Sequence, residues 1–161
     1  MSARVWLFGD NIDTDVLAPG RYMSGSIEEL ASHCLEAVNP YFASSVKSGD
    51  VLIAGRNFGV GSSREQAVEC LKILGIVAVL APSFAGIFYR NAINLGLPVL
   101  VGQAHQHAKD GDAFSIDIKS AILKLPSKTI QCEPIPEFLL DLIAAGGLVP
   151  QLENRFSRSR A

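Results

Sequence analysis

The segment from Gly55 to Gln66 contains the residues of this sequence best suited to chemistry on an anion. It brings together three glycines, two serines and two arginines in the order GRNFGVGSSREQ. Glycines let the backbone approach a ligand closely, and free amides at the start of a following helix favour a carboxylate or phosphate. Arg64 adds a planar fork for a carboxylate, and Ser62 and Ser63 add hydroxyls beside it. The segment therefore predicts an anion site.

Three better-known loops do not fit this segment. It has no Gly-Lys-Ser/Thr of a P-loop, it lacks the third glycine of a dinucleotide-binding fingerprint, and its GSSR is not the G-x-S-x-G of a nucleophile elbow. A nucleotide-binding or acyl-enzyme function is therefore disfavoured. A simpler interpretation stays open, in which the serines only cap a helix and Arg64 is a solvated residue of its first turn.

The elements that must position these residues are a buried strand and an amphipathic helix. The apolar run VLIA at 51–54 is typical of a buried strand. Ser62 to Glu65 has the spacing of a capping box, and from Glu65 apolar residues recur at helical spacing until Gly75 ends the pattern. The sequence thus places the anion site where a strand turns into a helix.

Similar patterns in the rest of the chain predict a single α/β domain spanning residues 1–161. Two units in which a buried strand is followed by a helix predict a short parallel part with right-handed crossovers. Two segments that alternate apolar and polar residues predict antiparallel strands, so a mixed sheet is expected. The expected elements are strands at 5–8, 76–80, 98–101, 113–118 and 122–125, a loop at 10–26, and helices from Ser26 to about residue 38, from Ser83 to Gly96 and at 136–145. Ser26 and Ser83 are expected to cap the first two of these helices. A frayed tail is expected at 155–161, in a mobile end that starts at about residue 151.

Composition limits the class of function. Of 161 residues, 48% are hydrophobic and 19% charged, which suits one domain with a full core or a surface covered by a partner chain. A formal net charge of −2 disfavours nucleic-acid binding. The longest apolar run, at 76–82, is too short to span a membrane, and the first residues lack the features of a secretory signal. We therefore expect a cytoplasmic location.

The cysteines and histidines do not predict a metal site. Cys34, Cys70 and Cys132 are odd in number, far apart and without a C-x-x-C spacing, which indicates reduced, buried thiols rather than disulfides or a zinc or iron-sulphur site. His105 and His107 lie on one side of a strand with no third ligand in view, so a surface pair is expected. The sequence predicts no metal ion on this chain.

Several motifs together resemble the aconitase superfamily, and specifically the separate small subunits of isopropylmalate isomerases and their homoaconitase relatives. GRNFGVGSSRE at 55–65 resembles their substrate-binding segment. Three further motifs agree in order and spacing: GDNIDTD at 9–15, PGRY at 19–22, and PSFA followed by IFYRNAIN within 82–94. The likeness covers residues 4–150, and several separate motifs in the same order are far more specific than one glycine loop.

The resemblance implies a fold, a partner and a reaction. The fold is a three-layer β/β/α swivelling domain, and it closes over a [4Fe-4S] cluster that cysteines of a separate large subunit hold. The reaction is the dehydration and rehydration of a small hydroxy-polycarboxylate, as in the leucine-pathway interconversion of 2- and 3-isopropylmalate. Such a small subunit is active only with its large subunit, and self-association of small subunits is also expected.

The resemblance also implies roles for six residues. Ser62 matches the serine that removes the carbon-bound proton, and Arg64 matches the arginine that binds a substrate carboxylate and stabilises that base. Asp15 matches a loop aspartate of the same polar network, although an aspartate in this turn-rich loop also commonly bonds its own backbone. The remaining candidates for substrate binding are Ser63, Gly61 and Arg21. A serine works as a base only if helix-terminal amides and a guanidinium stabilise its alkoxide.

Some features of the sequence leave alternatives open. Gly86 stands where the family usually has arginine, and Gln66 replaces a histidine often found after SSRE. The loop RYMSGS at 21–26 has mixed polarity, so it does not decide between an isopropyl group and an extra carboxylate, and Arg21 is as well explained as a solvated loop residue. Homocitrate, citramalate and dimethylmalate are alternative substrates. A noncatalytic carboxylate-binding or regulatory module is the alternative of another class.

Overall fold

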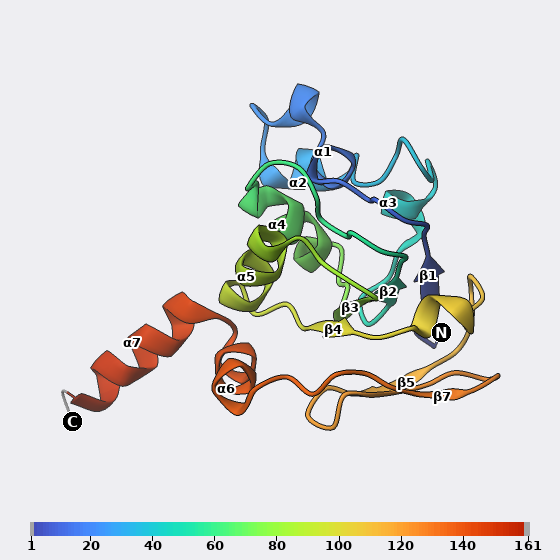
Figure 1. Ribbon diagram of the computed structural model, residues 1–161. Coiled ribbons are helices and arrows are strands. Elements are labelled where there is room, and N and C mark those ends of the chain that lie inside the picture. The colour runs from blue at the N-terminus through green and yellow to red at the C-terminus, as the bar shows by residue number, and fades with distance from the viewer. Residues whose placement is uncertain (1, 160–161) are drawn as a thin grey trace.

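The computed structural model describes residues 2–159, except for the side chains of residues 158 and 159, and arranges them in three layers. Two layers are β-sheets and the third contains helices (Figure 1). The strands are β1 (Val5–Leu7), β2 (Val51–Ile53), β3 (Ala78–Ala81), β4 (Val99–Val101), β5 (Ser115–Asp117), β6 (Ile122–Lys124) and β7 (Thr129–Gln131). The helices are α1 (Thr14–Leu17), α2 (Ile27–Ala31), α3 (Phe42–Ser45), α4 (Glu65–Ile73), α5 (Gly86–Asn94), α6 (Glu137–Ala145), α7 (Leu148–Ser159) and the 3-10 helices η1 (Gly20–Tyr22) and η2 (Ala104–Gln106).

The strands form two separate sheets. The first is four-stranded and parallel in the order β1-β2-β3-β4, with Val5 opposite Val51 and Val51 opposite Ala78. The second is three-stranded and antiparallel in the order β5-β6-β7. The predicted α/β class and three-layer arrangement are confirmed. The parallel and antiparallel strands make two sheets, however, where a single mixed sheet was expected.

The parallel sheet is buried on both faces, which is why its strands are continuous apolar runs. Trp6 and Leu52 point toward the helices and belong to the core between the helices and the sheet. Val5, Ile53 and Leu100 point the opposite way and pack with residues of the antiparallel sheet. The result is two stacked apolar cores that fix the carboxyl ends of the parallel strands, where the anion site was predicted.

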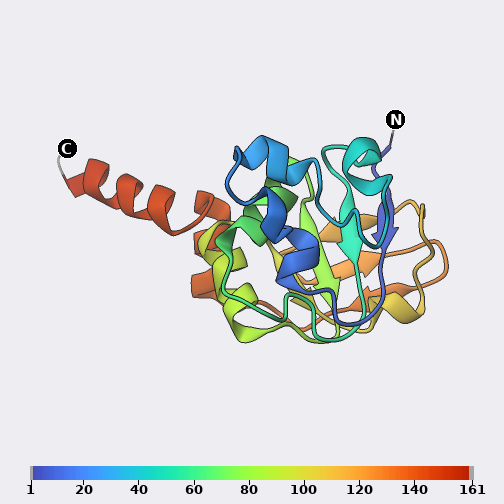
Figure 2. The same ribbon diagram turned by 90° about the horizontal axis from the view of Figure 1, so that it is seen from above.

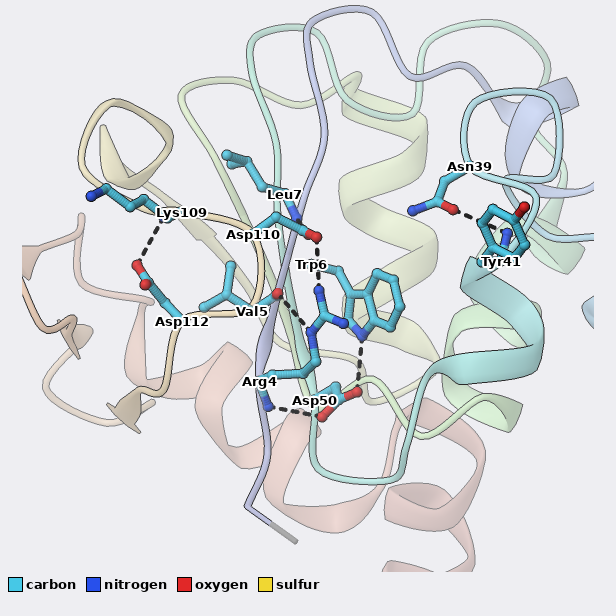
Figure 3. Close-up of polar contacts among 10 residues, drawn as sticks. All are labelled: Arg4, Val5, Trp6, Leu7, Asn39, Tyr41, Asp50, Lys109, Asp110 and Asp112. Carbon is cyan, nitrogen blue, oxygen red and sulfur yellow. Dashed lines mark hydrogen bonds and ion pairs between the residues drawn. The ribbon is translucent and has the colours of Figure 1, made fainter.

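A buried carboxylate fixes the start of β1 against the turn before β2 (Figure 3). Asp50 is 1% exposed and accepts hydrogen bonds from the backbone amides of Arg4 and Lys47 and from Trp6 Nε1, each at 2.9 Å. The guanidinium of Arg4 lies 3.8 Å from the Trp6 ring centroid, and its Nη2 donates to Asp110 at 2.8 Å. Because these contacts join β1 to distant segments, they hold the loop that follows β1 in register with β2.

The boundaries of several elements differ from the expectation. The helix that Ser26 caps is confirmed, with Ser26 Oγ accepting from the Glu29 amide, but α2 ends at Ala31 and turns follow. Leu35 adopts a left-handed φ of 61°, which no α-helix continues through. The expected loop at 10–26 contains α1 and η1, and β7 was not expected, since its three residues are too short to show a pattern.

The chain ends in an amphipathic helix that was not expected. The structure describes α7 as helical to Ser159, so residues 155–159 are helical where a frayed tail was predicted. Figures 1 and 2 show α7 extending away from the layered domain. Its mobility stays a prediction, and the last two residues of the expected tail lie outside the described part. Among the described residues, no helix has the length and apolar character that crossing a membrane requires.

Candidate active site

The loops that follow β1 and β2 pair with each other at the carboxyl edge of the parallel sheet. The amide of Gly59 donates to the Ile12 carbonyl at 2.7 Å, and the amide of Thr14 donates to the Val60 carbonyl at 2.8 Å. An isolated parallel bridge joins Asp13 and Val60 between these bonds. Neighbouring parallel strands end at one edge, so the GDNIDTD motif and the glycine-rich segment meet there.

Ser62 is held by the hydroxyl of Thr14. The Ser62 amide donates to Thr14 Oγ1 at 3.1 Å, and the two hydroxyl oxygens lie 3.3 Å apart. Thr14 is 3% exposed, whereas Ser62 lies on the surface. Thr14 was not identified from the sequence, and the only signal for it was its place between the two aspartates of the DTD motif. It fixes the candidate base from a distance of 48 residues along the chain.

Gly61 is required by this close approach. Its φ is 110°, a value that side-chain-bearing residues rarely adopt. A Cβ atom at Gly61 would also lie 2.9 Å from Thr14 Oγ1, in the space between the two hydroxyl-bearing residues. The glycine therefore lets Ser62 reach Thr14, while its direct contact with substrate stays a prediction.

Arg64 and Asp15 form an ion pair beside Ser62. Arg64 Nη1 donates to Asp15 Oδ1 at 2.8 Å and to the Ala18 carbonyl at 3.0 Å. Asp15 Oδ1 also accepts from the Gly20 amide at 3.0 Å. The bond from Arg64, and then that from Gly20, hold the pKa of the Asp15 carboxyl below its ordinary value of 3.8. These bonds fix the Nη1 edge of the guanidinium, and the Arg64 side chain stays partly exposed.

Neither serine caps α4, in contrast to the predicted capping box. The N-cap residue is Arg64, in extended conformation and with no side-chain capping bond. The amide and hydroxyl of Ser62 face Thr14 instead. Ser63 is exposed, and its carbonyl accepts from Asn91 Nδ2 at 3.4 Å. Because no side chain caps the helix, its first amides keep their affinity for an anion beside Arg64.

Arg21 follows Gly20, whose amide donates to Asp15 of the ion pair. It belongs to η1, and its guanidinium carbon is 5.4 Å from the ring centroid of Tyr22. A Cβ atom on the preceding Gly20 would lie 3.3 Å from Asp15 Oδ1 and 3.6 Å from Arg64 Nη2, so η1 begins directly against the pair. The structure thus brings Ser62, Arg64 and Asp15 together and places Arg21 at their border.

An aromatic cluster packs against the glycine-rich loop through Phe58. Phe58 is fully buried, with its ring centroid 5.1 Å from that of Phe88. Ser83 was expected to cap the helix at 86–94, but Ala85 is its N-cap, and Ser83 Oγ accepts from the Asn57 amide at 2.9 Å. Ser83 therefore fixes the loop rather than the helix, because its hydroxyl is turned toward the loop backbone.

A guanidinium lies near the position where the family's arginine is missing. Gly86 is exposed at the start of α5, and a Cβ atom there would lie 3.8 Å from Arg90 Nη1. Arg90 is four residues further along the same helix. Positive charge is thus present beside Gly86 even though Gly86 itself has none.

The cysteines do not fit an iron-sulphur cluster. All three are free and buried, and burial raises the pKa of Cys70 to about 12 and that of Cys132 to about 11. Burial also raises the pKa of Cys34 well above its ordinary value. Cluster ligands are thiolates, which these surroundings disfavour. In the part of the chain that the structure describes, no three His, Cys, Asp or Glu side chains gather as metal ligands, His105 and His107 included.

Comparison with known proteins agrees with this geometry. Residues 23–104 match the family model of the aconitase C-terminal domain. The chain is 51% identical over 149 residues to a methanogen homoaconitase small subunit from Methanothermobacter thermautotrophicus, covering 91% of this chain and 86% of that protein. It is 46% identical over 158 residues to a 3-isopropylmalate dehydratase small subunit from Halothermothrix orenii, covering 96% of each.

A solved structure shares the whole fold. The crystal structure of a 3-isopropylmalate dehydratase from Methanocaldococcus jannaschii superposes with a TM-score of 0.92 at 45% identity, covering 98% of this chain and 96% of that one. The relative from Halothermothrix orenii and the solved structure match nearly the whole chain, and the family model matches a part that includes the glycine-rich loop. The chain therefore belongs to the aconitase C-terminal domain family, among the small subunits of the 3-isopropylmalate dehydratases and homoaconitases.

Proposed function

We propose that this chain is the small subunit of a heteromeric hydro-lyase that interconverts 2-isopropylmalate and 3-isopropylmalate by dehydration and rehydration, as a step of leucine biosynthesis. The observation that carries the proposal is the Ser62 hydroxyl, bound to the buried Thr14 hydroxyl and adjacent to an arginine that Asp15 holds in place. The names of the relatives support the same reaction.

Arg64 binds a carboxylate of the substrate in this proposal. Its Nη1 is occupied by Asp15 and the Ala18 carbonyl, and among the described residues no hydrogen bond is made by Nη2 or Nε. An arginine that is held by one nitrogen presents the others at a fixed angle, which favours bidentate recognition of a carboxylate. Asp15 acts as the positioning partner and keeps its negative charge at neutral pH, because its pKa is lowered.

Ser62 removes the proton from the substrate carbon and returns one in the reverse direction. Its alkoxide form gains from the Thr14 hydroxyl, which can donate to Ser62 Oγ while accepting from the Ser62 amide. The uncapped start of α4 and the Arg64 guanidinium add positive potential at the same place. Ser63 and Gly61 line the same edge and contact the substrate from the surface of the loop.

A large subunit completes the site in this proposal. Gly61, Ser62 and Ser63 are all exposed, so this chain alone does not exclude water from the reacting atoms. We assign the [4Fe-4S] cluster to that partner, since the thiols of this chain do not suit one. Three buried free thiols also suit a reducing compartment, the cytoplasm.

A homoaconitase small subunit is the second candidate, because the methanogen homoaconitase relative is 51% identical to this chain. Both reactions use the same serine and arginine, and their substrates differ in the group at the position of the isopropyl side chain. Citramalate and dimethylmalate test the smaller side chains. The sequence of the 21–26 loop does not favour one substrate, so the assay decides.

The test is reconstitution with a cluster-bearing large subunit. The assembled pair is assayed against isopropylmalate, homocitrate, citramalate and dimethylmalate, and the purified small subunit is assayed alone. We expect turnover by the pair, none by the small subunit, and none by a pair with Ser62→Ala that still assembles. Turnover by the small subunit alone overturns the proposal. Carboxylate binding by this chain without any copurifying large subunit supports the noncatalytic alternative instead.

A further inference from the structure

The turn η1 forms one wall of the Arg64 and Asp15 pair. The Gly20 amide donates to Asp15 Oδ1, the same oxygen that Arg64 binds. Arg21 follows directly, so the direction of its guanidinium depends on how η1 is seated. The turn itself is short and has no buried residue. Backbone bonds from Tyr22 to Pro19 and from Met23 to Gly20 close it, and the Tyr22 carbonyl accepts from the Gly25 amide. Its position must therefore come from contacts outside it.

One such contact is the packing of Tyr22 and Met23 against the core, and another is an aromatic stack. The rings of Tyr22 and His33 lie parallel, 4° apart in orientation, with their centroids 3.5 Å apart. His33 Nδ1 lies 2.7 Å from Glu36 Oε2, and a carboxylate only accepts, so the imidazole donates this bond. Glu36 thereby fixes the plane of the imidazole on which Tyr22 lies.

The segment that carries His33 is itself tied back to α1. The amide of Leu35 donates to the Val16 carbonyl at 2.9 Å, and Leu35 is fully buried with a left-handed φ of 61°. The contacts thus form a closed ring. They run from Asp15 through Gly20 to Tyr22, from Tyr22 to His33, and from the segment of His33 back to α1, which contains Asp15. A closed ring resists displacement of any one member.

We propose that His33 is a positioning residue for substrate binding, which acts through its stack with Tyr22 to seat η1 against the Arg64 and Asp15 pair. It sets the place where the Gly20 amide meets Asp15 and where the Arg21 guanidinium meets the substrate, and Glu36 assists it. The inference rests on the proposed function for its kinetic consequence. The seating of η1 is measurable on this chain without turnover.

The kinetic consequence is a change in KM rather than in kcat. Thr14 is held by its own bonds to Ser62 and to the Val60 carbonyl, which do not involve η1, so proton transfer keeps its geometry. Loss of an aromatic stack weakens the seating by about threefold to tenfold in population, and KM rises by the same factor. His33→Phe keeps a ring beneath Tyr22 and restores most of the binding, although it loses the bond to Glu36.

The experiment compares His33→Ala and His33→Phe with the wild type and with His107→Ala. His107 is a matched control because it is the C-cap residue of η2 and its carbonyl accepts from Ser127, a segment that takes no part in the ring. Hydrogen exchange and the proton chemical shift of the Gly20 amide are measured by NMR on the full small subunit. KM and kcat are measured on the reconstituted pair. We expect faster exchange by about threefold to tenfold in His33→Ala, near-wild-type values in His33→Phe and His107→Ala, and a matching rise of KM with kcat within about twofold.

The results separate the two proposals. An inactive wild-type pair defeats the proposed function but leaves the NMR test of η1 intact. An active pair in which His33→Ala has unchanged KM and an unchanged Gly20 amide overturns the positioning role. A loss of kcat with KM unchanged overturns it as well. If His33→Ala does not fold, Glu36→Ala decides in its place, since it keeps both rings but frees the imidazole to turn, and the same shifts in smaller degree are expected.

Discussion

Replacement of Thr14 by valine isolates one hydroxyl in the candidate active site. Valine keeps the β-branched shape of threonine and fills the same buried space, since Thr14 is 3% exposed. The backbone bond from the Thr14 amide to the Val60 carbonyl, at 2.8 Å, is retained. The substitution therefore removes only the acceptor of the Ser62 amide and the hydroxyl 3.3 Å from Ser62 Oγ.

The expected effect on turnover follows from the change in charge at Ser62. In the resting state the two bonds to the Thr14 hydroxyl are each worth about 1 kcal/mol, so the free energy of unfolding falls by about 1 to 2 kcal/mol. When Ser62 carries negative charge, the bond from Thr14 becomes one to an ionised oxygen and is worth about 1.5 to 3 kcal/mol. The rate depends on the difference between these two states, about 0.5 to 2 kcal/mol, because the resting-state bond is lost as well. At about 1.36 kcal/mol per tenfold in rate, kcat falls by about 2- to 30-fold.

The assay measures kcat and KM of the reconstituted pair, with a urea midpoint for the small subunit. Thr14→Ser is the matched control, because it keeps the hydroxyl and loses only a methyl group. We expect it to keep kcat near that of the wild type and above that of Thr14→Val, because the bond to Ser62 is retained. The reasoning is refuted if Thr14→Val turns over at the wild-type rate while Ser62→Ala is inactive, since Ser62 would then act without this hydroxyl.

Three further measurements follow from the structure. Gly61→Ala forces a side chain into a φ of 110° and within 2.9 Å of Thr14 Oγ1, so denaturant unfolding should show a loss of about 1 to 3 kcal/mol, and wild-type stability would contradict the geometry. Because the pKa of Asp15 is lowered, the stability that the carboxylate contributes is complete above its ordinary pKa of 3.8 and is lost as the pH falls through the lowered value. In Asp15→Asn the free energy of unfolding should therefore depend less on pH below about pH 4. An unchanged pH dependence in that range would count against the Arg64 pair. All three thiols are buried, with the pKa of Cys70 raised to about 12, so alkylation at pH 8 should be slow in the folded chain and complete in denaturant, and rapid native labelling would show that they are accessible.

Local sequence patterns were sufficient for the elements around the site. The apolar run at 51–54 forms β2, and the apolar spacing after Glu65 forms α4, with Gly75 left-handed beyond its end at a φ of 90°. The final predicted helix is α6, which Gly146 terminates at a φ of 91°. These features depend on side-chain periodicity and on residues with special φ values, and both signals are local in the sequence.

Other features depended on contacts between distant residues and were not predictable in the same way. The serines of SSRE have the spacing of a cap, but Thr14 competes for Ser62 from across the sheet edge. Ser83 lost its expected capping role to the Asn57 amide in the same manner. The strand β7 is only three residues long, and its pairing with β6 rather than its own sequence makes it a strand.

The sequence by itself determined that Ser62, Ser63 and Arg64 stand at a strand-to-helix turn suited to an anion, because glycines, hydroxyls and an arginine follow one another there. Only the tertiary structure decided which groups act on them. Arg64 meets Asp15 across 49 residues and Ser62 meets Thr14 across 48, because parallel strands bring their carboxyl ends to one edge however far apart they lie in the chain. The chemistry of the loop is local, but its support and its orientation are properties of the fold.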